Sequence, residues 1–221
     1  ACAPFRRLSL CNRNLEKIPT STTKHDLLVD VCMAANYEAQ SLITYHDKHQ
    51  LTNSYSQLCT VLARSFADIG DIVRGRDLYL GKKKNQNGKE TEREKLEENL
   101  QKIFGNIYNE LTSSRNGKNG EEAKNYYAKE KDPDFLKLRE HWWTANRHTV
   151  WEAITCSKEL NNSSYFRATC SDGGDSTSPS VARNKCRCDG ANAGKAGGNV
   201  NIVPTYFDYV PQYLRWFEEW A

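Results

Sequence analysis

The sequence lacks several features that would narrow its function at once. None of its cysteines forms a C-x-x-C pair, methionine occurs once, and no apolar run approaches the roughly 18 residues that a membrane-spanning helix needs. The N-terminal residues do not follow the basic, apolar and small-residue order of a signal peptide. We therefore expect no direct membrane insertion by this chain, and we expect it to be part of a larger protein.

Catalytic and nucleotide-binding motifs are also missing. There is no G-x-S-x-G elbow, no H-E-x-x-H pair and no suggestive spacing of Cys and His. The stretch 70–75 has two glycines at phosphate-loop spacing, but Arg76 and Asp77 stand where Lys and Ser or Thr are required. No strand precedes that stretch to aim backbone N–H groups at a phosphate. The sequence predicts no enzyme activity and no cofactor.

What the sequence does have is eight cysteines in 221 residues. That density is ordinary for an oxidised extracellular domain and unusual for a reduced cytosolic one. Four of the cysteines could in principle form a thiolate zinc site: Cys156, Cys170, Cys186 and Cys188. In an oxidising compartment such thiols more often form two disulfides. We predict disulfides and no metal site.

Composition and charge describe a folded domain with a polar surface. The chain is 38% hydrophobic and 27% charged, and its 5 Trp, 11 Tyr and 7 Phe are too many for a disordered protein. The formal net charge of +3 is too small to make nucleic acid the default partner. Function then depends on whether the positive charge is clustered.

Helical periodicity dominates the chain. Apolar residues recur at three- and four-residue steps from Asp26, the predicted N-cap, and again from Tyr55 and from Thr91. Asp132 followed by proline predicts the start of a fourth helix, and Pro211 opens a last one. The last helix is expected to bury Leu214, Phe217 and Trp220, and the predicted core also includes Trp142, Trp143, Trp151 and Trp216.

Polar, Gly- and Asn-rich segments separate the predicted helices. We expect loops at 82–90, 113–130 and 157–204, and an irregular lead-in at 1–24. No strand run or internal repeat stands out. The predicted fold is mainly α: a helical bundle with long disulfide-stapled loops.

Two basic clusters are candidate sites for an anionic ligand. The first comprises Arg74, Arg76, Lys82, Lys83 and Lys84, and the second comprises Arg183, Lys185 and Arg187, with Lys195 in the same loop. A local excess of positive charge could hold a sulfated glycan through modest, salt-screened interactions. A solvated lysine loop is the alternative interpretation.

The predicted disulfide pairing follows from which segments should pack together. Cys32 and Cys59 lie on apolar faces of predicted helices, and Cys156 ends the Trp-rich helix that must enter the same core. Cys59 should reach the stapled loop, where a short local bond would remain. The predicted bonds are Cys32–Cys156, Cys59–Cys188 and Cys170–Cys186.

Six segments identify a family when they are taken together. They are 1–11 (ACAPFRRLSLC), 63–75 (ARSFADIGDIVRG), 138–143 (LREHWW), 151–156 (WEAITC), 186–188 (CRC) and 204–220 (PTYFDYVPQYLRWFEEW). In this order they resemble the Duffy-binding-like domain, and most closely its alpha class in the variant erythrocyte membrane adhesins of the malaria parasite, Plasmodium falciparum.

The resemblance implies a non-enzymatic host-cell adhesion module. It implies a place on the extracellular face of the infected erythrocyte membrane, anchored by a transmembrane segment outside this chain. The implied partners are host receptors or sulfated glycans on erythrocytes or endothelium, antibodies against loops that vary between members, and neighbouring domains. The alternative is a structural spacer that orients a neighbouring receptor-binding domain.

The resemblance also implies a division into subdomains. Residues 1–24 would end the first subdomain, residues 25–221 would form the helical second one, and the third would be missing. Cys2 and Cys11 match a pair that bonds to cysteines further upstream in the family. We therefore expect them to be unpaired or bonded to each other.

Overall fold

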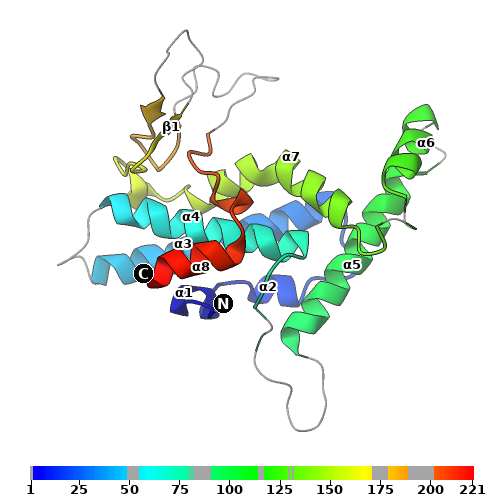
Figure 1. Cartoon of the computed structure of the whole chain (residues 1–221), viewed down its shortest axis with the longest axis horizontal. Helices are drawn as coiled ribbons and strands as arrows, with labels where there is room; N and C mark the ends of the chain where they lie inside the picture. Colours follow the sequence, from blue (N-terminus) through cyan, green and yellow to red (C-terminus); the bar gives the residue numbers. More distant parts are fainter. Residues whose placement is uncertain are drawn as a thin grey trace.

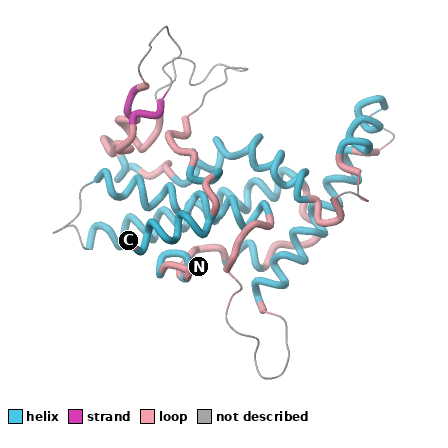
Figure 2. Tube along the Cα trace, in the orientation of Figure 1, coloured by secondary structure: helices cyan, strands magenta, loops and turns pink. Residues whose placement is uncertain are grey.

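The computed structural model of the chain describes residues 2–48, 55–79, 81, 91–113, 117–128, 130, 132–170, 179–188 and 202–221. These residues are mainly helical, as predicted, and the strands form one small patch (Figures 1 and 2). The helices are α1 (Phe5–Leu8), α2 (Arg13–Glu16), α3 (Lys24–Lys48), α4 (Tyr55–Arg74), α5 (Glu92–Leu111), α6 (Gly117–Tyr126), α7 (Leu136–Ile154) and α8 (Gln212–Trp220). Two 3₁₀ turns, η2 (Lys158–Leu160) and η3 (Phe207–Tyr209), accompany strands β1 (Ala168–Cys170) and β2 (Ser180–Val181).

Helix α4 is the centre of the core. It packs against α3 and α7 on its apolar sides and against η3 and α8 on another side (Figure 1). All ten residues from Ser65 to Arg74 are buried. The Phe66 ring lies 5.0 Å from the Trp143 ring and 5.1 Å from the Trp151 ring. Both tryptophans are fully buried, which confirms their predicted place in the core.

The helix starts follow local capping chemistry. Helix α5 begins where the sequence predicts, and Thr91 caps it: the Thr91 hydroxyl accepts a hydrogen bond from the Glu94 N–H, and the Glu94 carboxylate accepts one from the Thr91 N–H. Helix α3 begins two residues before the predicted cap, and the Thr23 hydroxyl accepts a hydrogen bond from the N–H of Asp26. Asp26 therefore belongs to the first turn of the helix, where its negative charge interacts favourably with the positive end of the helix dipole.

Helix α7 begins later than the sequence predicts. Phe135 precedes the helix in a left-handed conformation with φ of 56°, and its side chain is buried. Asp132 still provides acceptors for the free backbone N–H groups at the start of α7: its carboxylate oxygens accept hydrogen bonds from the N–H groups of Leu136 and Lys137, each at 2.8 Å. The predicted cap position is therefore wrong: Phe135 is the N-cap residue and Pro133 lies before the helix, while Asp132 accepts hydrogen bonds from the first helical N–H groups from three residues before the cap.

Three expected loops contain regular structure. Helix α6 lies within 113–130, where Tyr127 OH bonds His141 Nδ1 of α7 at 2.8 Å and Lys137 lies over the Tyr126 ring at 3.4 Å. These tertiary contacts offset two Asn-Gly steps that favour a loop. Strands β1 and β2 form a two-stranded antiparallel sheet within 157–204, and 1–24 holds α1 and α2. The loop 82–90 lies outside the described residues.

Helix α8 forms where predicted but buries the opposite face. Leu214, Phe217 and Trp220, expected in the core, are 45%, 75% and 50% exposed. The buried residues are Gln212, Arg215 and Trp216. The neighbouring face of α4 is polar, so α8 turns its polar side inward.

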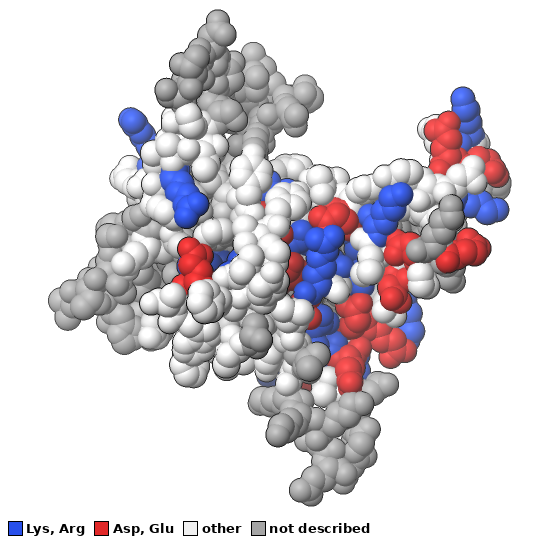
Figure 3. Space-filling view, viewed as in Figure 1, with Lys and Arg blue, Asp and Glu red and all other residues white. Residues whose placement is uncertain are grey.

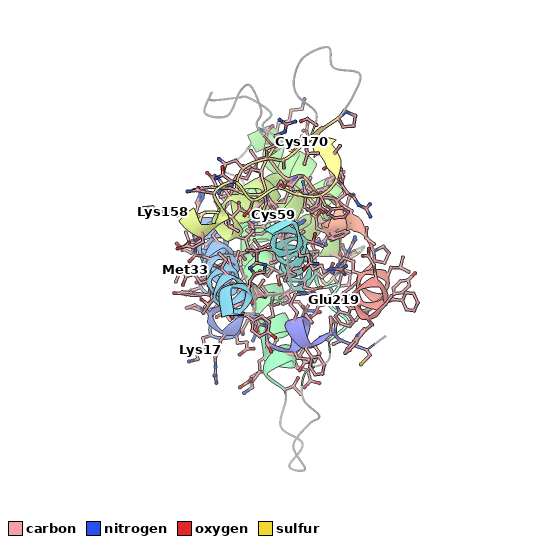
Figure 4. All side chains as sticks on the ribbon, turned by 90° about the vertical axis from the view of Figure 1, so that its left-hand side faces the viewer. Lys17, Met33, Cys59, Lys158, Cys170 and Glu219 are labelled. Atoms are coloured by element: carbon pink, nitrogen blue, oxygen red, sulfur yellow. A yellow bond between two sulfur atoms is a disulfide. The ribbon has the colours of Figure 1, made fainter. Side chains whose placement is uncertain are left out.

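The predicted disulfide bonds are wrong in their pairing. The structure has Cys59–Cys186 and Cys170–Cys188 (Figure 4) instead of Cys59–Cys188 and Cys170–Cys186. The two residues Lys185 and Cys186 have left-handed backbones with φ of 50° and 53°. This turn points Cys186 into the core toward α4 and leaves Cys188 beside β1.

The predicted Cys32–Cys156 bond is not formed, and both cysteines are free. Helices α3 and α7 do pack together, but Cys32 Sγ lies 3.9 Å from the carbonyl oxygen of Thr149, and Asn36 donates to Cys156 Sγ at 3.0 Å. The two sulfurs therefore face different parts of the opposite helix. Cys2 and Cys11 are also free, as expected.

Candidate binding surface

A buried polar stripe runs along α4. Ser65, Asp68, Asp71 and Arg74 recur at three-residue steps, so each lies beside the one before it and the stripe winds around the helix. Arg215 of α8 bridges two of them, with Nη2 at 2.7 Å from Asp68 Oδ1 and 2.5 Å from Asp71 Oδ2. Buried charges are stable only when paired and hydrogen-bonded. The stripe therefore requires the polar side of α8 as its partner.

The same stripe binds the N-terminal segment. Arg6 of α1 places Nη2 at 2.7 Å from Asp68 Oδ2 and also pairs with Glu219 of α8 at 2.9 Å. Burial opposes ionisation of Asp68, but the charges of Arg6 and Arg215 outweigh it and lower the pKa of that carboxyl. For Asp71, burial is the stronger effect and raises its pKa. Helices α1, α4 and α8 are thus joined by one ionic network.

The first predicted basic cluster is only partly available to a ligand. Arg74 was expected to bind an anion, but it is 1% exposed and pairs with Asp71 at 2.8 Å. That expectation is wrong, because Arg74 balances the α4 carboxylates. Arg76 has a side chain that is 58% exposed and pairs with Glu140 at 3.0 Å. Lys82, Lys83 and Lys84 lie outside the described residues.

In the second basic cluster, Lys185 and Arg187 bind the end of α7, whereas Arg183 is exposed. Lys185 donates to the carbonyl of Cys156 at 3.3 Å, and Arg187 donates to Thr155 Oγ1 and to the carbonyl of Glu152, each at 2.7 Å. These cations occupy the C-terminal end of α7, where the helix dipole is negative. They are therefore poor candidates for a mobile ligand. Arg183 is exposed, and Lys195 lies outside the described residues.

A pocket of about 230 Å³ opens beside Arg76. Its wall is largely formed by the segment that leads into α8, and its lining residues are Asp71, Arg76, Leu78, Asp208, Tyr209, Val210, Pro211, Gln212 and Tyr213. Asp208 pairs with Arg147 at 2.8 Å, and the Arg147 guanidinium lies 5.2 Å from the centre of the Tyr209 ring. The pocket thus has neutralised charges at its base and tyrosines at its rim.

An apolar face extends from this pocket across α8 to α1. Figure 3 shows that the surface over α8 carries few charged side chains. Trp220 packs edge-on against the 75%-exposed Phe5 of α1 at 5.6 Å, and its indole N–H donates to the Cys2 carbonyl at 3.0 Å. We call this surface the α1–α8 face; its large exposed residues are Phe5, Leu8, Tyr213, Leu214, Phe217 and Trp220.

A second apolar groove lies on α3. It is lined by Leu28, Val29, Cys32, Met33, Asn36, Tyr37 and Thr149. Burial raises the pKa of the Cys32 thiol to about 11, so this free cysteine is a neutral thiol and a weak nucleophile at neutral pH. Across the described residues, no group of three or more His, Cys, Asp or Glu side chains is arranged to hold a metal ion. Three of the four cysteines considered for zinc are used in disulfides.

The comparisons with known proteins agree with this architecture. The family model of the Duffy binding domain matches residues 1–215. The chain belongs to the Duffy binding domain family. No match among curated proteins was found. Of the helices in the described part of this domain, none is both long enough and apolar enough to cross a membrane.

Solved domains of Plasmodium falciparum membrane protein 1 (PfEMP1) are similar to the chain over its whole length. The NTS-DBL1(alpha-1) domain of the varO strain is 38% identical with a TM-score of 0.70, and the chain covers 43% of it. The varO double domain NTS-DBL1-alpha with CIDR-gamma is 40% identical with a TM-score of 0.72, and 27% of it is covered. The PfEMP1 IT4var13 DBLbeta domain bound to ICAM-1 is 33% identical with a TM-score of 0.65 and 44% covered. This Duffy binding domain therefore spans less than half the length of these neighbours.

The ionic network was missed at the sequence level, although a signal for it was present. Helix α4 was interpreted through its apolar residues alone. Asp68, Asp71 and Arg74 interrupt that pattern at regular steps in the part of α4, from Ser65 to Arg74, where every residue is buried. A buried helix with a periodic polar stripe predicts a polar partner, and Arg215 of α8 is that partner.

Proposed function

We propose that this domain is a non-enzymatic adhesion module that binds a host cell-surface receptor from the surface of the infected erythrocyte. The single observation that carries the proposal is its full-length similarity to domains of a parasite membrane protein, one of which is bound to ICAM-1. ICAM-1 is the ligand of that DBLbeta domain, and it is not assigned to this chain. For this chain we propose the class, a receptor on erythrocytes or endothelium, and no particular molecule.

A protein receptor is favoured over a sulfated glycan by the charges of the described residues. Of the predicted basic residues that are described, Arg74, Lys185 and Arg187 are engaged in internal contacts. Arg76 and Arg183 remain exposed, and two separate cations give only a weak, salt-screened attraction for a polyanion. Glycan binding therefore rests mainly on Lys82, Lys83 and Lys84.

Enzymatic treatment of host cells distinguishes the two classes of receptor. The fluorescent purified domain is added to erythrocytes and endothelial cells that are untreated, trypsin-treated or heparinase-treated. The proposal predicts saturable binding that trypsin removes and heparinase leaves in place. Absence of saturable binding to every host cell type, with correctly folded protein, would contradict the adhesion proposal.

The lysine cluster is tested by a separate variant. Lys82→Gln, Lys83→Gln and Lys84→Gln together remove three positive charges, and Lys95→Gln, Lys118→Gln and Lys124→Gln, at exposed helix positions, provide a triple control. If the cluster binds sulfated glycans, retention on immobilised heparin falls for the first triple alone and falls further with salt, since the Debye length is about 8 Å at 0.15 M. Equal retention of both variants on heparin would contradict glycan binding by Lys82, Lys83 and Lys84.

A spacer that orients a neighbouring domain is the second candidate function. It is favoured by the varO double domain, of which this chain covers 27%. A spacer without its own receptor binds no host cell under any of these treatments. The same assay therefore separates the two candidates.

A further inference from the structure

The small sheet presents two exposed arginines beside an exposed aromatic ring. Phe166 is 49% exposed, and Arg167 and Arg183 are exposed as well. Strands β1 and β2 are antiparallel, and just before them the Tyr165 N–H donates to the Ala182 carbonyl at 3.0 Å. This hydrogen bond places the segment that carries Phe166 and Arg167 beside the segment that carries Arg183. We call these three residues the sheet patch.

The two arginines of the sheet patch are free to pair with a partner. Neither Arg167 nor Arg183 forms an ion pair with any residue that the structure describes, whereas the neighbouring Arg64 pairs with Glu218 at 3.3 Å. Figure 3 shows blue side chains and no red ones around the small sheet, while both colours alternate over α5 and α6. A guanidinium group offers a planar fork of donors that matches a carboxylate. The patch is therefore complementary to an acidic ligand.

Buried neighbours hold the sheet patch in place. Tyr165 is buried, and its hydroxyl donates to Thr205 Oγ1 at 3.2 Å. Both disulfide bonds lie in the same part of the chain and tie it to α4 and to β1. The Arg167 guanidinium lies 5.0 Å from the centre of the Phe166 ring, which orients it at the surface. Groups that are already ordered lose less conformational entropy when they bind.

We propose that the sheet patch binds an acidic segment of a host protein receptor. In this complex each arginine donates hydrogen bonds to a carboxylate of the partner, and an apolar side chain of the partner covers Phe166. The proposal rests on the proposed adhesion function and specifies the chemistry of the partner at one surface of the domain.

The composition of the patch favours a protein segment over a sulfated glycan. Aromatic residues and arginine are enriched in the centres of protein interfaces and among the residues that dominate binding energy. A polyanionic glycan would need a longer row of free cations. Lys185 and Arg187, the nearest further cations in sequence, already donate to carbonyl groups at the end of α7.

Variants that remove the charges and the ring test the patch separately. Arg167→Gln with Arg183→Gln removes both guanidinium groups, and Phe166→Ala removes the ring. Arg13→Gln with Lys124→Gln removes two exposed charges from α2 and α6 and is the matched control. The fluorescent whole chain of each variant is added to erythrocytes and endothelial cells that are untreated, trypsin-treated or heparinase-treated.

Trypsin-sensitive binding should depend on the patch. The double arginine variant should lose about tenfold or more in affinity, because it gives up charge-assisted hydrogen bonds to two carboxylates. Phe166→Ala should also weaken binding, whereas the control variant should bind like the parent. Heparinase should change none of these affinities. Since all the altered side chains are exposed, each variant should keep the melting temperature of the parent.

Arginine-specific labelling of the parent protein decides the matter if a variant does not fold. Phenylglyoxal modifies accessible guanidinium groups, and mass spectrometry maps the modified residues in the free protein and in protein bound to cells. Arg167 and Arg183 should be protected in the bound protein. Arg13 on α2 should be modified equally in both.

The outcomes separate this proposal from the proposed adhesion. A parent protein that binds no host cell would overturn both. Parent binding that the double arginine variant retains in full would overturn the patch alone, as would equal losses in that variant and the control. Arg167 and Arg183 that remain fully modified in bound protein would have the same meaning. A loss confined to heparinase-sensitive binding would assign the patch to a sulfated glycan and rule out the acidic protein segment.

Discussion

Four of the five tryptophans are buried and Trp220 is half exposed, so the cost of replacing a tryptophan should depend on its position. Trp151 is fully buried and donates its indole N–H to the Cys186 carbonyl at 3.2 Å, whereas Trp220 is 50% exposed. Trp151→Ala should lower the free energy of unfolding by about 3–5 kcal/mol, because it leaves a large cavity. Trp220→Ala is the matched control and should cost much less. Chemical denaturation checks both, and similar costs would contradict the assigned burial.

Gly70 tests how closely α4 approaches α7. A Cβ atom at this position would lie 2.7 Å from a ring carbon of Trp143, which is too close for any residue larger than glycine. Gly70→Ala should therefore destabilise by about 1–3 kcal/mol despite its better helix propensity. Gly105 of α5 is the control, since its Cβ would meet Phe135 at an ordinary 3.5 Å. Gly105→Ala should be neutral or stabilise by up to about 1 kcal/mol in thermal unfolding.

Asp68 makes stability depend on pH. Its pKa is lowered from an ordinary 3.8, so the stability it contributes is present above that value and is lost as the pH falls through the folded-state pKa. Asp68→Asn should cost about 3–5 kcal/mol at pH 7, since Arg6 and Arg215 lose a buried partner. The gap between variant and parent should narrow in denaturation curves below pH 4. A constant gap would contradict the ionised state of Asp68, and Glu98→Gln on the exposed side of α5 should change little.

Apolar periodicity predicted where helices form better than it predicted which side of a helix is buried. The positions of α3, α4, α5, α7 and α8 follow from apolar spacing and capping residues. The buried side of α8 could not be predicted in this way, because Leu214, Phe217 and Trp220 form the more apolar side of the helix and yet are exposed. The inward side is set by Asp68 and Asp71 of α4, far away in sequence, and local pattern carries no information about such a partner.

The disulfide pairing also depends on tertiary structure that the local sequence does not reveal. Cys59 was correctly expected to bond the loop that contains Cys186 and Cys188, but two residues so close in sequence cannot be distinguished without the backbone of the turn. The basic clusters were also predicted from sequence proximity alone. Burial of Arg74 and capping of α7 by Arg187 depend on tertiary contacts that proximity does not reveal. The division at residue 24 stays a prediction.

Peptide mapping under non-reducing conditions tests the disulfides of the folded chain. We expect linked peptides for Cys59–Cys186 and Cys170–Cys188, and none for the two exchanged pairings. Cys59–Cys186 spans 127 residues, so replacing both cysteines by Ser should cost about 5 kcal/mol in the chain-entropy model. The bond across 18 residues should contribute less, about 3 kcal/mol. A Cys59–Cys188 peptide would contradict the turn at Lys185.

At the scale of the whole molecule, one ionic network connects the two ends of the chain. Arg6 and Arg7 of α1 reach Asp68 and Asp77, and Asp77 also accepts from Gln212 of α8 at 2.8 Å. The arrangement keeps charge inside and places aromatic side chains outside, at the α1–α8 face. The fold depends on this orientation of α8.

Oxidative labelling of the isolated native chain tests the inversion directly, because Trp216 and Trp220 lie one turn apart on the same helix. Trp216 is 2% exposed and donates to Asp68 at 3.4 Å, whereas Trp220 is 50% exposed. We predict rapid oxidation of Trp220 and protection of Trp216 as complete as that of Trp143. Faster oxidation of Trp216 than of Trp220 would show that α8 buries its apolar side and would contradict the account.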